Sequence, residues 1–244
     1  MAETVLITGA SRGIGAETAR RFAQAGYRVA INYCRSAQRA EALAAEINAG
    51  GGTALAVQAD VADGSQVREM FRQVRQRLGF VSALVHNAGI ARQQLFIDVS
   101  EAEWNRLFAV HVNGAFHCCQ CALPEMLSRR RGSIVMVSSI WGLVGASCEA
   151  PYSAAKAALI GLTKALAKEA GPSGVRVNCV APGVIDTEMN AALDEAARAA
   201  LREETPLGAL GAPADVAEAI FYLASPQARF VTGQVLSPNG GIVI

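Results

Sequence analysis

The sequence predicts an α/β fold built from repeated strand–helix–strand units. Along the 244-residue chain, short apolar runs alternate with longer runs in which apolar residues recur every three to four positions. Hydrophobic residues make up 52% of the chain, which is ample for a sheet that helices cover on both faces. A glycine-rich turn joins the first apolar run to the first helix-like run.

These patterns predict the individual strands and helices along the chain. Residues 50–52 are all glycine and end the second helix. Neither a linker, a repeat nor a low-complexity tract interrupts the alternation, so residues 1–244 are predicted to form a single domain. The predicted strands are residues 4–8, 27–33, 54–59, 83–86, 133–138, 175–180 and 234–237. The predicted helices are residues 16–25, 37–49, 66–78, 101–127 (one or two helices), 151–170, 194–204 and 214–223.

Charge balance and cysteine content narrow the function classes. A formal net charge of +1 argues against a nucleic-acid-binding surface or an electrostatic membrane anchor. No apolar run reaches the length of a transmembrane span, and the chain enters a strand at residue 4 without a signal peptide. Six cysteines are too few for a disulfide framework and suit free thiols in a reducing compartment. We therefore expect a soluble, cytoplasmic protein.

Three residues in the second half of the chain carry the strongest chemical signal. Tyr152 and Lys156 lie four positions apart in a predicted helix, so their side chains share one helical face. A phenol loses its proton near pH ~10, and a nearby cation favours the phenolate, so we expect Lys156 to lower the pKa of Tyr152. Ser139, at a strand end, supplies a hydroxyl for the same substrate oxygen. This set is suited to moving a proton onto or off a carbonyl oxygen.

The glycine turn after the first strand predicts a hydride source for that proton chemistry. Gly9, Gly13 and Gly15 allow a tight turn and let backbone N–H groups approach a pyrophosphate at the N-terminus of the next helix. Their spacing, Gly-x-x-x-Gly-x-Gly, differs from the Gly-x-Gly-x-x-Gly of the commonest dinucleotide fingerprint. Together with the later Ser/Tyr/Lys set, the strand, turn and helix predict a bound nicotinamide dinucleotide.

These motifs resemble those of the short-chain dehydrogenase/reductase family over the whole chain. The resemblance implies a doubly wound Rossmann-type fold with a seven-stranded parallel sheet, a nicotinamide cofactor and, usually, a homotetramer. It also implies catalytic roles for Ser139, Tyr152 and Lys156. The matching residues are Thr8-Gly9-Ala10-Ser11-Arg12-Gly13-Ile14-Gly15, Asn87-Ala88-Gly89, Ser139, Tyr152-Ser153-Ala154-Ala155-Lys156, Pro182-Gly183, Val231-Thr232-Gly233-Gln234-Val235 and Asn239-Gly240-Gly241.

The resemblance further implies the residues of a cofactor site. Ligands on such sheets bind at the carboxyl ends of the strands, at a switch point that family topology places between the first and fourth strands. Asp60 and Val61 match the position that contacts adenine in the family, although Asp60 also suits a helix N-cap or a turn. The residues expected to bind the cofactor are Gly9, Ser11, Arg12, Gly13, Ile14, Gly15, Arg35, Asp60, Val61, Asn87, Ala88, Gly89, Tyr152, Lys156, Pro182, Gly183, Ile185 and Thr187.

The region after the second strand favours NADP(H) over NAD(H). NAD-preferring relatives place a carboxylate there to hold the ribose 2′-hydroxyl, and residues 30–36 contain none. Guanidinium groups form charge-assisted bonds to a 2′-phosphate, and Arg12 and Arg35 are the available cations. The alternative interpretation is that Arg12 is a solvated loop residue.

The chain departs from the family pattern at two histidines. The pattern Asn-x-x-Gly-x-Phe carries a fourth catalytic residue, and here His111 stands at the asparagine's register, three residues before Gly114. In the family this residue helps to hold a water that links the lysine to solvent. Histidine can bind a water too, and it titrates near neutrality, so a catalytic His111 and a His111 that only packs the helix are equal alternatives. His86 stands where an asparagine is common and is predicted to be structural.

A cluster of His117, Cys118, Cys119 and Cys121 does not predict a metal site. Consecutive residues on a helix point in different directions, so this is not the spacing of metal ligands. Small cysteines in a packed helix, or at a subunit contact, are the preferred interpretation. No metal is expected.

Resemblance also suggests the substrate, a ketone carried by a protein. The chain looks most like the 3-oxoacyl-[acyl-carrier-protein] reductase type of fatty acid biosynthesis. The cations at residues 129–131, Arg-Arg-Arg, are candidates for docking an acidic carrier. The second basic position expected near the entrance falls in residues 171–174, which hold no cation.

Two other functions stay open. Residues 138–142 and 144–149, with His111, resemble elongation factor P 5-aminopentanone reductases, which reduce a ketone on a modified lysine of a protein. On either reading Trp141, Cys148 and Glu149 are expected to shape the substrate mouth and residues 186–210 to form a lid. The remaining alternative is a non-catalytic NADP-binding scaffold, which the intact Ser/Tyr/Lys set argues against.

Overall fold

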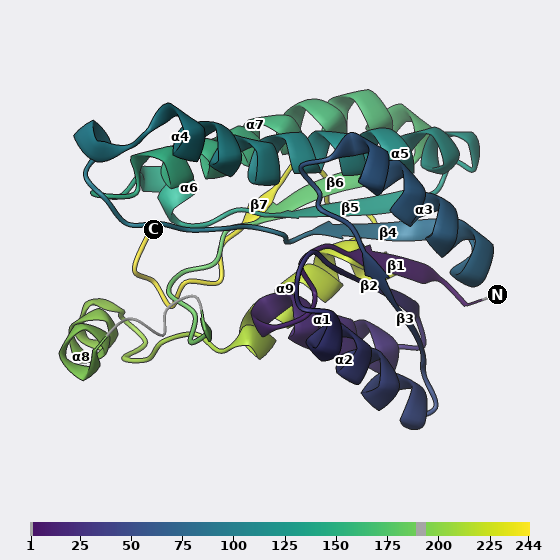
Figure 1. Cartoon of the computed structure of the whole chain (residues 1–244), viewed down its shortest axis with the longest axis horizontal. Coiled ribbons are helices and arrows are strands. Elements are labelled where there is room, and N and C mark those ends of the chain that lie inside the picture. The colour runs from purple at the N-terminus through teal and green to yellow at the C-terminus, as the bar shows by residue number, and fades with distance from the viewer. Residues whose placement is uncertain (1, 189–193) are drawn as a thin grey trace.

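The fold is a seven-stranded, all-parallel sheet with the strand order β3-β2-β1-β4-β5-β6-β7 (Figure 1). A computed structural model describes residues 2–188 and 194–244. The predicted α/β class, the parallel sheet and the doubly wound topology are confirmed. The strands are β1 Thr4–Ile7, β2 Arg28–Tyr33, β3 Thr53–Gln58, β4 Val81–His86, β5 Gly132–Val137, β6 Val175–Val180 and β7 Val235–Leu236.

Helices separate the strands, as the alternating pattern predicts. The α-helices are α1 Gly13–Gln24, α2 Ala37–Ala49, α3 Gly64–Leu78, α4 Glu101–Phe108, α5 Gly114–Ser128, α6 Trp141–Val144, α7 Ala150–Ala170, α8 Glu195–Glu204 and α9 Pro213–Ala224. The predicted bounds of α2 and β6 match the structure, and most others agree within one to three residues. Helix α6 was not predicted from the sequence, because a helix of four residues is too short to show a period.

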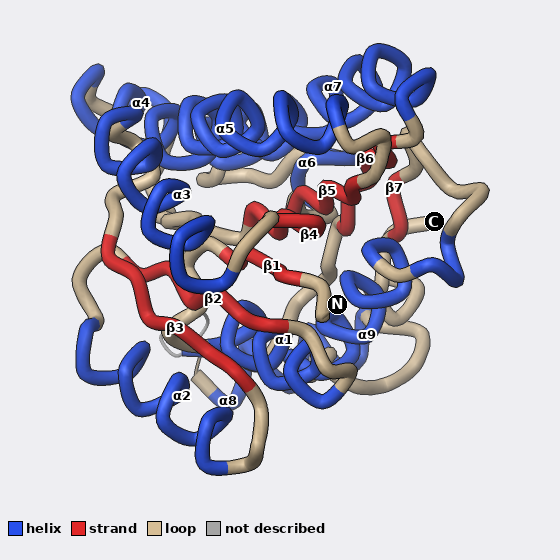
Figure 2. Tube along the Cα trace, turned by 90° about the vertical axis from the view of Figure 1, so that its right-hand side faces the viewer, coloured by secondary structure: helices blue, strands red, loops and turns tan. Residues whose placement is uncertain are grey.

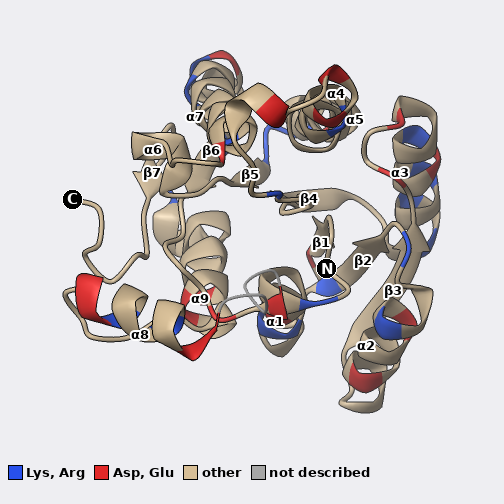
Figure 3. Cartoon of the chain, turned by 60° about the vertical axis from the view of Figure 1, so that its left-hand side comes forward, with Lys and Arg blue, Asp and Glu red and all other residues tan. Residues whose placement is uncertain are grey.

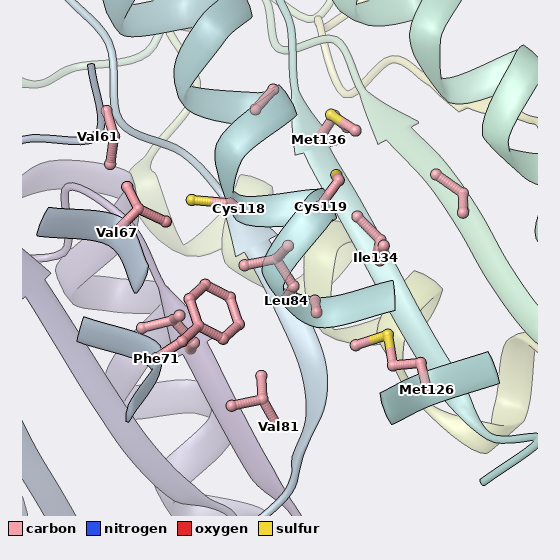
Figure 4. Packing of buried hydrophobic residues seen from close by; sticks show 14 of the residues in the cluster. Val61, Val67, Phe71, Val81, Leu84, Cys118, Cys119, Met126, Ile134 and Met136 are labelled. Atoms are coloured by element: carbon pink, nitrogen blue, oxygen red, sulfur yellow. The ribbon is translucent and has the colours of Figure 1, made fainter. Parts of the chain in front are cut away.

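Two helical layers enclose the sheet. Helices α1, α2 and α9 cover one face, and α3, α5 and α7 cover the other (Figures 1 and 2). Strands β1 and β4 are buried along their whole length, as expected of parallel strands with helices on both sides. On one side Phe71 of α3 and Met126 of α5 pack toward Leu84 of β4 (Figure 4). The outer helices α2, α3 and α8 each carry both acidic and basic residues (Figure 3).

The strand order places the switch point between β1 and β4. After β1 the chain turns into α1 on one face, whereas after β4 it continues toward α4 and α5 on the other (Figure 1). The two loops diverge above neighbouring strand ends, and this divergence opens a crevice at the carboxyl edge of the sheet.

A π-helix at Ala109–Asn113 joins α4 to α5. The segment predicted as one or two helices is therefore two α-helices with a wider turn between them. The ring of His86, at the end of β4, contacts the carbonyl oxygen of His111 through Nε2 at 3.0 Å. Because π-turns break the regular backbone pattern and often occur at functional sites, this segment is a structural marker of the crevice.

Candidate active site

A small cavity lies at the carboxyl edge of the sheet, beside the switch point. Its volume is about 90 Å³. It brings together Ser139, Tyr152, Lys156 and His111, which come from the end of β5, from α7 and from the π-helix. The other lining residues are Ile14, Asn87, Gly89, Val137, Ser138, Pro182 and Gly183. The four candidate catalytic residues and five of the expected cofactor-binding positions outside that set thus meet at one place.

Backbone structure fixes the Ser/Tyr/Lys set. Ser139 follows β5 and its Oγ accepts a hydrogen bond from the backbone N–H of Trp141, at 3.2 Å, which begins α6. Helix α7 starts with Pro151 in its first turn, a position where the missing N–H costs nothing. Ser138 Oγ donates to the backbone oxygen of Lys156 at 2.8 Å and ties α7 to the end of β5. Tyr152 and Lys156 therefore sit on a helix that is tied to the end of β5, and Ser139 lies in the short connection between β5 and α6.

Lys156 is a buried cation. Its side chain donates from Nζ to the backbone oxygen of Val137 at 2.8 Å, and the residue is only 4% exposed. Burial lowers the pKa of Lys156 from 10.5 to about 8, with a smaller opposing effect from Cys179. Nζ lies 5.4 Å from the centroid of the Tyr152 ring. At neutral pH the cavity consequently holds one positive charge, close to the phenol.

The expectation of a Tyr152 pKa that is lowered toward neutrality is wrong for this structure. Burial raises the pKa of Tyr152 to about 12; a hydrogen bond with Ser139 lowers it and Glu149 raises it by smaller amounts. The Lys156 ammonium is directed to the Val137 carbonyl, so loss of water around the phenol outweighs the cation's attraction for a phenolate. Tyr152 therefore keeps its proton at neutral pH, which is the state required of a proton donor.

His111 is buried and neutral. Burial, followed by the charge of Lys156, holds its pKa well below 6.5, so the expectation that it titrates near neutrality is wrong. Nε2 lies 2.8 Å from the backbone oxygen and 3.1 Å from the backbone nitrogen of Ile90. Among the described residues, Nδ1 has no hydrogen-bond partner. The ring also meets Tyr152 edge-on, with centroids 5.5 Å apart. His111 thus offers the cavity a buried ring nitrogen without a charge.

Replacing His111 with asparagine should leave the shape of the pH–rate profile unchanged between pH 6 and 8. The wild-type ring stays neutral in that range because its pKa lies well below 6.5, so the change removes no titrating group. Any effect should appear in kcat, measured at saturating substrate across the range. His117→Asn is the matched control, since His117 contacts the backbone oxygen of Val61 and does not line the cavity. A limb of the pH–rate profile that shifts in His111→Asn but not in His117→Asn would contradict a neutral His111.

The glycine turn fits a dinucleotide pyrophosphate. Gly9 has a φ of +62°, and a Cβ there would lie 2.8 Å from Cα of Ala88; a Cβ on Gly15 would lie 2.6 Å from the Gly9 oxygen. The close approach of these backbones leaves no room for a side chain. Helix α1 begins at Gly13 without a side-chain cap and without an acid in its first turn. Its N–H groups therefore remain suited to an anion.

A buried asparagine that the sequence analysis missed supports this turn. Asn32, on β2, contacts the N–H of Gly9 through Oδ1 at 3.3 Å and the oxygen of Ala59 through Nδ2 at 3.1 Å. Asn87 reinforces the turn from the β4 side, donating from Nδ2 to the backbone oxygens of Thr8 and Gly9. The available signal was an asparagine within the otherwise apolar and aromatic run of residues 29–33.

Most other expected cofactor positions surround the same crevice. Thr187 packs near Gly13, within 3.6 Å of a Cβ built there, and Ile185 is buried in a bridge to Gly211. Asp60 accepts the N–H of Ala62 and pairs with Arg106 at 2.9 Å, so it is a turn residue; the N-cap of α3 is Asp63. The sequence interpretation of Asp60 as a turn residue is confirmed, and that of an N-cap is wrong.

A second arginine that was not predicted from the sequence lies on the same carboxylate as Arg12. Arg12 and Arg39 share one partner, the carboxylate of Glu188, whereas Arg35 is not among that carboxylate's partners in the described chain. Arg39 lies in the first turn of α2, four residues beyond Arg35. Neither Arg39 nor Glu188 was predicted as a site residue from the sequence, because both lie beyond the region at the end of β2.

The arginine run before β5 is remote from the cavity. Arg129 pairs with Glu125 and Arg131 pairs with Glu3, while Arg130 donates to the oxygen of Pro172. These residues precede β5, and the cavity lies beyond its other end, a separation of roughly 20 Å for a six-residue strand. The run therefore lies at the other end of β5 from the cavity, and its role in docking a carrier stays a prediction.

The structure also places Glu149 and part of the segment that was expected to form a lid. Glu149 precedes α7 and accepts a hydrogen bond from Gln93 at 3.1 Å, which links residues 90–99 to the turn before α7. Part of the expected lid, residues 189–193, lies outside the described residues.

In the described part of the chain, no group of three or more His, Cys, Asp or Glu side chains is arranged to hold a metal. There too, no helix combines the length and apolarity needed to cross a bilayer.

Comparison with known proteins gives consistent matches over the whole length. Residues 9–243 match a family model described as enoyl-(acyl carrier protein) reductase. The 3-oxoacyl-[acyl-carrier-protein] reductase of Staphylococcus aureus is 42% identical over 242 residues, which cover 99% of this chain and 98% of that protein.

Solved structures agree with this fold. A 3-oxoacyl-[acyl-carrier protein] reductase from Brucella melitensis matches with a TM-score of 0.93 and 34% identity, over 98% of this chain and 90% of that one. A gluconate 5-dehydrogenase from Burkholderia cenocepacia, solved with NADP and tartrate, matches with a TM-score of 0.93 and 35% identity, over 98% of this chain and 94% of that one.

Proposed function

Because the chain belongs to the short-chain dehydrogenase/reductase family, we propose that it reduces a 3-oxoacyl thioester on an acyl-carrier protein to the 3-hydroxyacyl form, using NADPH. The observation that carries the proposal is the cavity in which Ser139, Tyr152 and Lys156 meet beside the glycine turn. The two similar 3-oxoacyl reductases support the substrate class. The NADP complex of the gluconate 5-dehydrogenase supports the choice of cofactor.

Each side chain of the cavity has a role in this reaction. When bound, the nicotinamide supplies a hydride to the ketone carbon. Tyr152 then gives its proton to the ketone oxygen, and Ser139 donates a hydrogen bond to the same oxygen. Lys156 places its charge near the phenol and favours the negative charge that develops there as the proton leaves. His111 Nδ1 offers a hydrogen-bonding partner to a water or a hydroxyl inside the cavity.

Three sets of residues of this chain would hold the cofactor. The N–H groups at the start of α1 would bind the pyrophosphate, since no side chain caps them. The backbone around Asn87 to Gly89, with Pro182 and Gly183, would flank the nicotinamide end next to the cavity. Arg12 would approach the adenosine ribose. As the family resemblance implies, we extend the proposal to a homotetramer in the cytoplasm.

A second candidate is the reduction of the 5-aminopentanone ketone on a modified lysine of elongation factor P. The observation that favours it is Glu149, a half-buried acid in the turn before the catalytic helix, with Gln93 as its hydrogen-bond partner. A carboxylate at this position suits an amine on a substrate. A hydrophobic acyl chain gains nothing from it.

A side-by-side assay separates these functions. NADPH oxidation is followed with acetoacetyl-[acyl-carrier protein], with elongation factor P that carries the ketone, and with crotonyl-[acyl-carrier protein]. The last tests reduction of a carbon–carbon double bond, which the description of the family model raises. We expect the highest kcat/KM with the acetoacetyl carrier. A faster reaction with elongation factor P, or with the crotonyl carrier, would replace the first assignment.

A further inference from the structure

Glu188 joins two arginines that lie far from it in the sequence. Its Oε2 lies 3.2 Å from Nη1 of Arg12, and Nη1 of Arg39 donates to both carboxylate oxygens, at 2.6 and 2.7 Å. Arg12 belongs to the turn after β1, Arg39 to the first turn of α2, and Glu188 to the segment after β6. Three loops at the carboxyl edge of the sheet are thus held together by one carboxylate between two guanidinium groups.

This pair of guanidinium groups lies where an adenosine ribose would approach. Arg12 precedes α1, whose N-terminus suits the pyrophosphate, and Arg39 follows the end of β2, which selects the ribose substituent in dinucleotide folds. Two planar forks of N–H donors facing one point make a site for a group with several acceptor oxygens. Glu188 now supplies that group from within the chain.

We propose that Glu188 occupies the 2′-phosphate site of the cofactor, competes with that phosphate and so limits the preference for NADP(H) over NAD(H). This inference rests on the proposed function as far as the dinucleotide is concerned. A 2′-phosphate carries more negative charge than a carboxylate and has three free oxygens, so it can replace Glu188 on both arginines. A 2′-hydroxyl carries no charge and cannot. NAD(H) must therefore bind beside an intact ion-paired Glu188.

A 2′-phosphate can displace the Glu188 carboxylate because the ion pairs are exposed to solvent. The side chains of Arg12, Arg39 and Glu188 are 60%, 52% and 54% exposed. Water screens such pairs, so the carboxylate can leave for solvent without an uncompensated buried charge. Arg12 and Arg39 keep an anionic partner in both states. The carboxylate thus acts as a competitor that only a phosphate displaces.

Affinity measurements test the proposal without any ketone. Dissociation constants for NADP⁺ and NAD⁺ are measured by calorimetry for the wild type and for Glu188→Gln, which keeps the side chain's shape and removes its charge. We expect Glu188→Gln to bind NADP⁺ about tenfold more tightly, since the phosphate no longer competes with a carboxylate, and NAD⁺ within about twofold of the wild type. Glu195→Gln is the matched control, because Glu195 pairs with Arg202 on α8 and touches neither Arg12 nor Arg39.

A fragment and a second variant sharpen the test. Adenosine 2′-monophosphate should bind more tightly to Glu188→Gln, whereas adenosine 5′-monophosphate should not distinguish it from the wild type. Arg39→Gln should weaken NADP⁺ by about tenfold and spare NAD⁺. Equal changes for NADP⁺ and NAD⁺, or unchanged or weaker NADP⁺ binding in Glu188→Gln, would overturn this inference alone. A wild type that binds neither dinucleotide would overturn the proposed function as well.

Discussion

Tyr152→Phe should lower kcat by about 10²- to 10⁴-fold, the usual contribution of a positioned proton donor. The change removes one oxygen and leaves the ring, so the edge contact with His111 and the packing over Lys156 can remain. The phenol keeps its proton at neutral pH because burial raises its pKa to about 12. No other side chain is proposed as the proton donor, so the loss should be in chemistry. It is measured as NADPH oxidation at saturating ketone.

Cofactor binding separates this result from a misfolded variant. The Kd for NADPH in Tyr152→Phe should stay within about twofold of the wild type, because the loss then lies in the chemical step. Tyr222→Phe is a suitable control, since Tyr222 is 40% exposed on α9 and does not line the cavity. Turnover that survives in Tyr152→Phe would remove the proposed mechanism. Loss of both NADPH binding and turnover would indicate that the substitution disrupts the fold.

Lys156→Met should lower kcat by about 10²- to 10³-fold and, at neutral pH, stabilise the fold. The charge that favours the developing phenolate disappears, which accounts for the rate. Burial lowers the pKa of Lys156 from 10.5 to about 8, which corresponds to about 3 kcal/mol of cost for holding the charged form. Loss of the bond to Val137 offsets part of this gain, so we expect about 1–3 kcal/mol in the free energy of unfolding.

The stability difference should depend on pH in a defined window. Below pH ~8 the lysine is protonated in both folded and unfolded wild type, so the full cost is present. Between pH 8 and 10.5 the unfolded chain binds more protons than the folded one, and wild-type stability therefore rises relative to Lys156→Met. Urea unfolding of both proteins at pH 7, 9 and 10.5 measures the difference. A difference that does not shrink with pH, or a variant less stable at pH 7, would contradict a destabilising buried ammonium.

The architecture was readable from the sequence because burial imposes a simple pattern on parallel sheets. Strands covered on both faces, such as β4, are continuous apolar runs, and helices such as α2 show an apolar period between glycine and polar boundaries. The grouping of Ser139, Tyr152 and Lys156 followed from motif and resemblance, since each stands at a strand end or on one helical face. The local hydrophobic pattern and the order of the family's motifs were sufficient to predict the architecture and the catalytic set.

Other features depend on packing that one-dimensional spacing does not contain. The π-helix at Ala109–Asn113 arises where His86 contacts the backbone of His111, and no period marks it. The pKa of Tyr152 depends on where the Lys156 ammonium points, which is toward the Val137 oxygen. Arg39 and Glu188 lie 149 residues apart and meet only because the ends of β2 and β6 share an edge. Such contacts depend on the fold, and the spacing of residues in the sequence does not predict them.

The most direct measurement of the central claim follows the transferred atom. Wild-type protein is given acetoacetyl-[acyl-carrier protein], or the ketone-bearing elongation factor, with NADPH in which both hydrogens on nicotinamide C4 are deuterium, and the product is analysed by mass spectrometry. We predict one deuterium on the former ketone carbon, and a rate that collapses in Tyr152→Phe. NADPH that binds without transferring deuterium to either ketone would contradict the account.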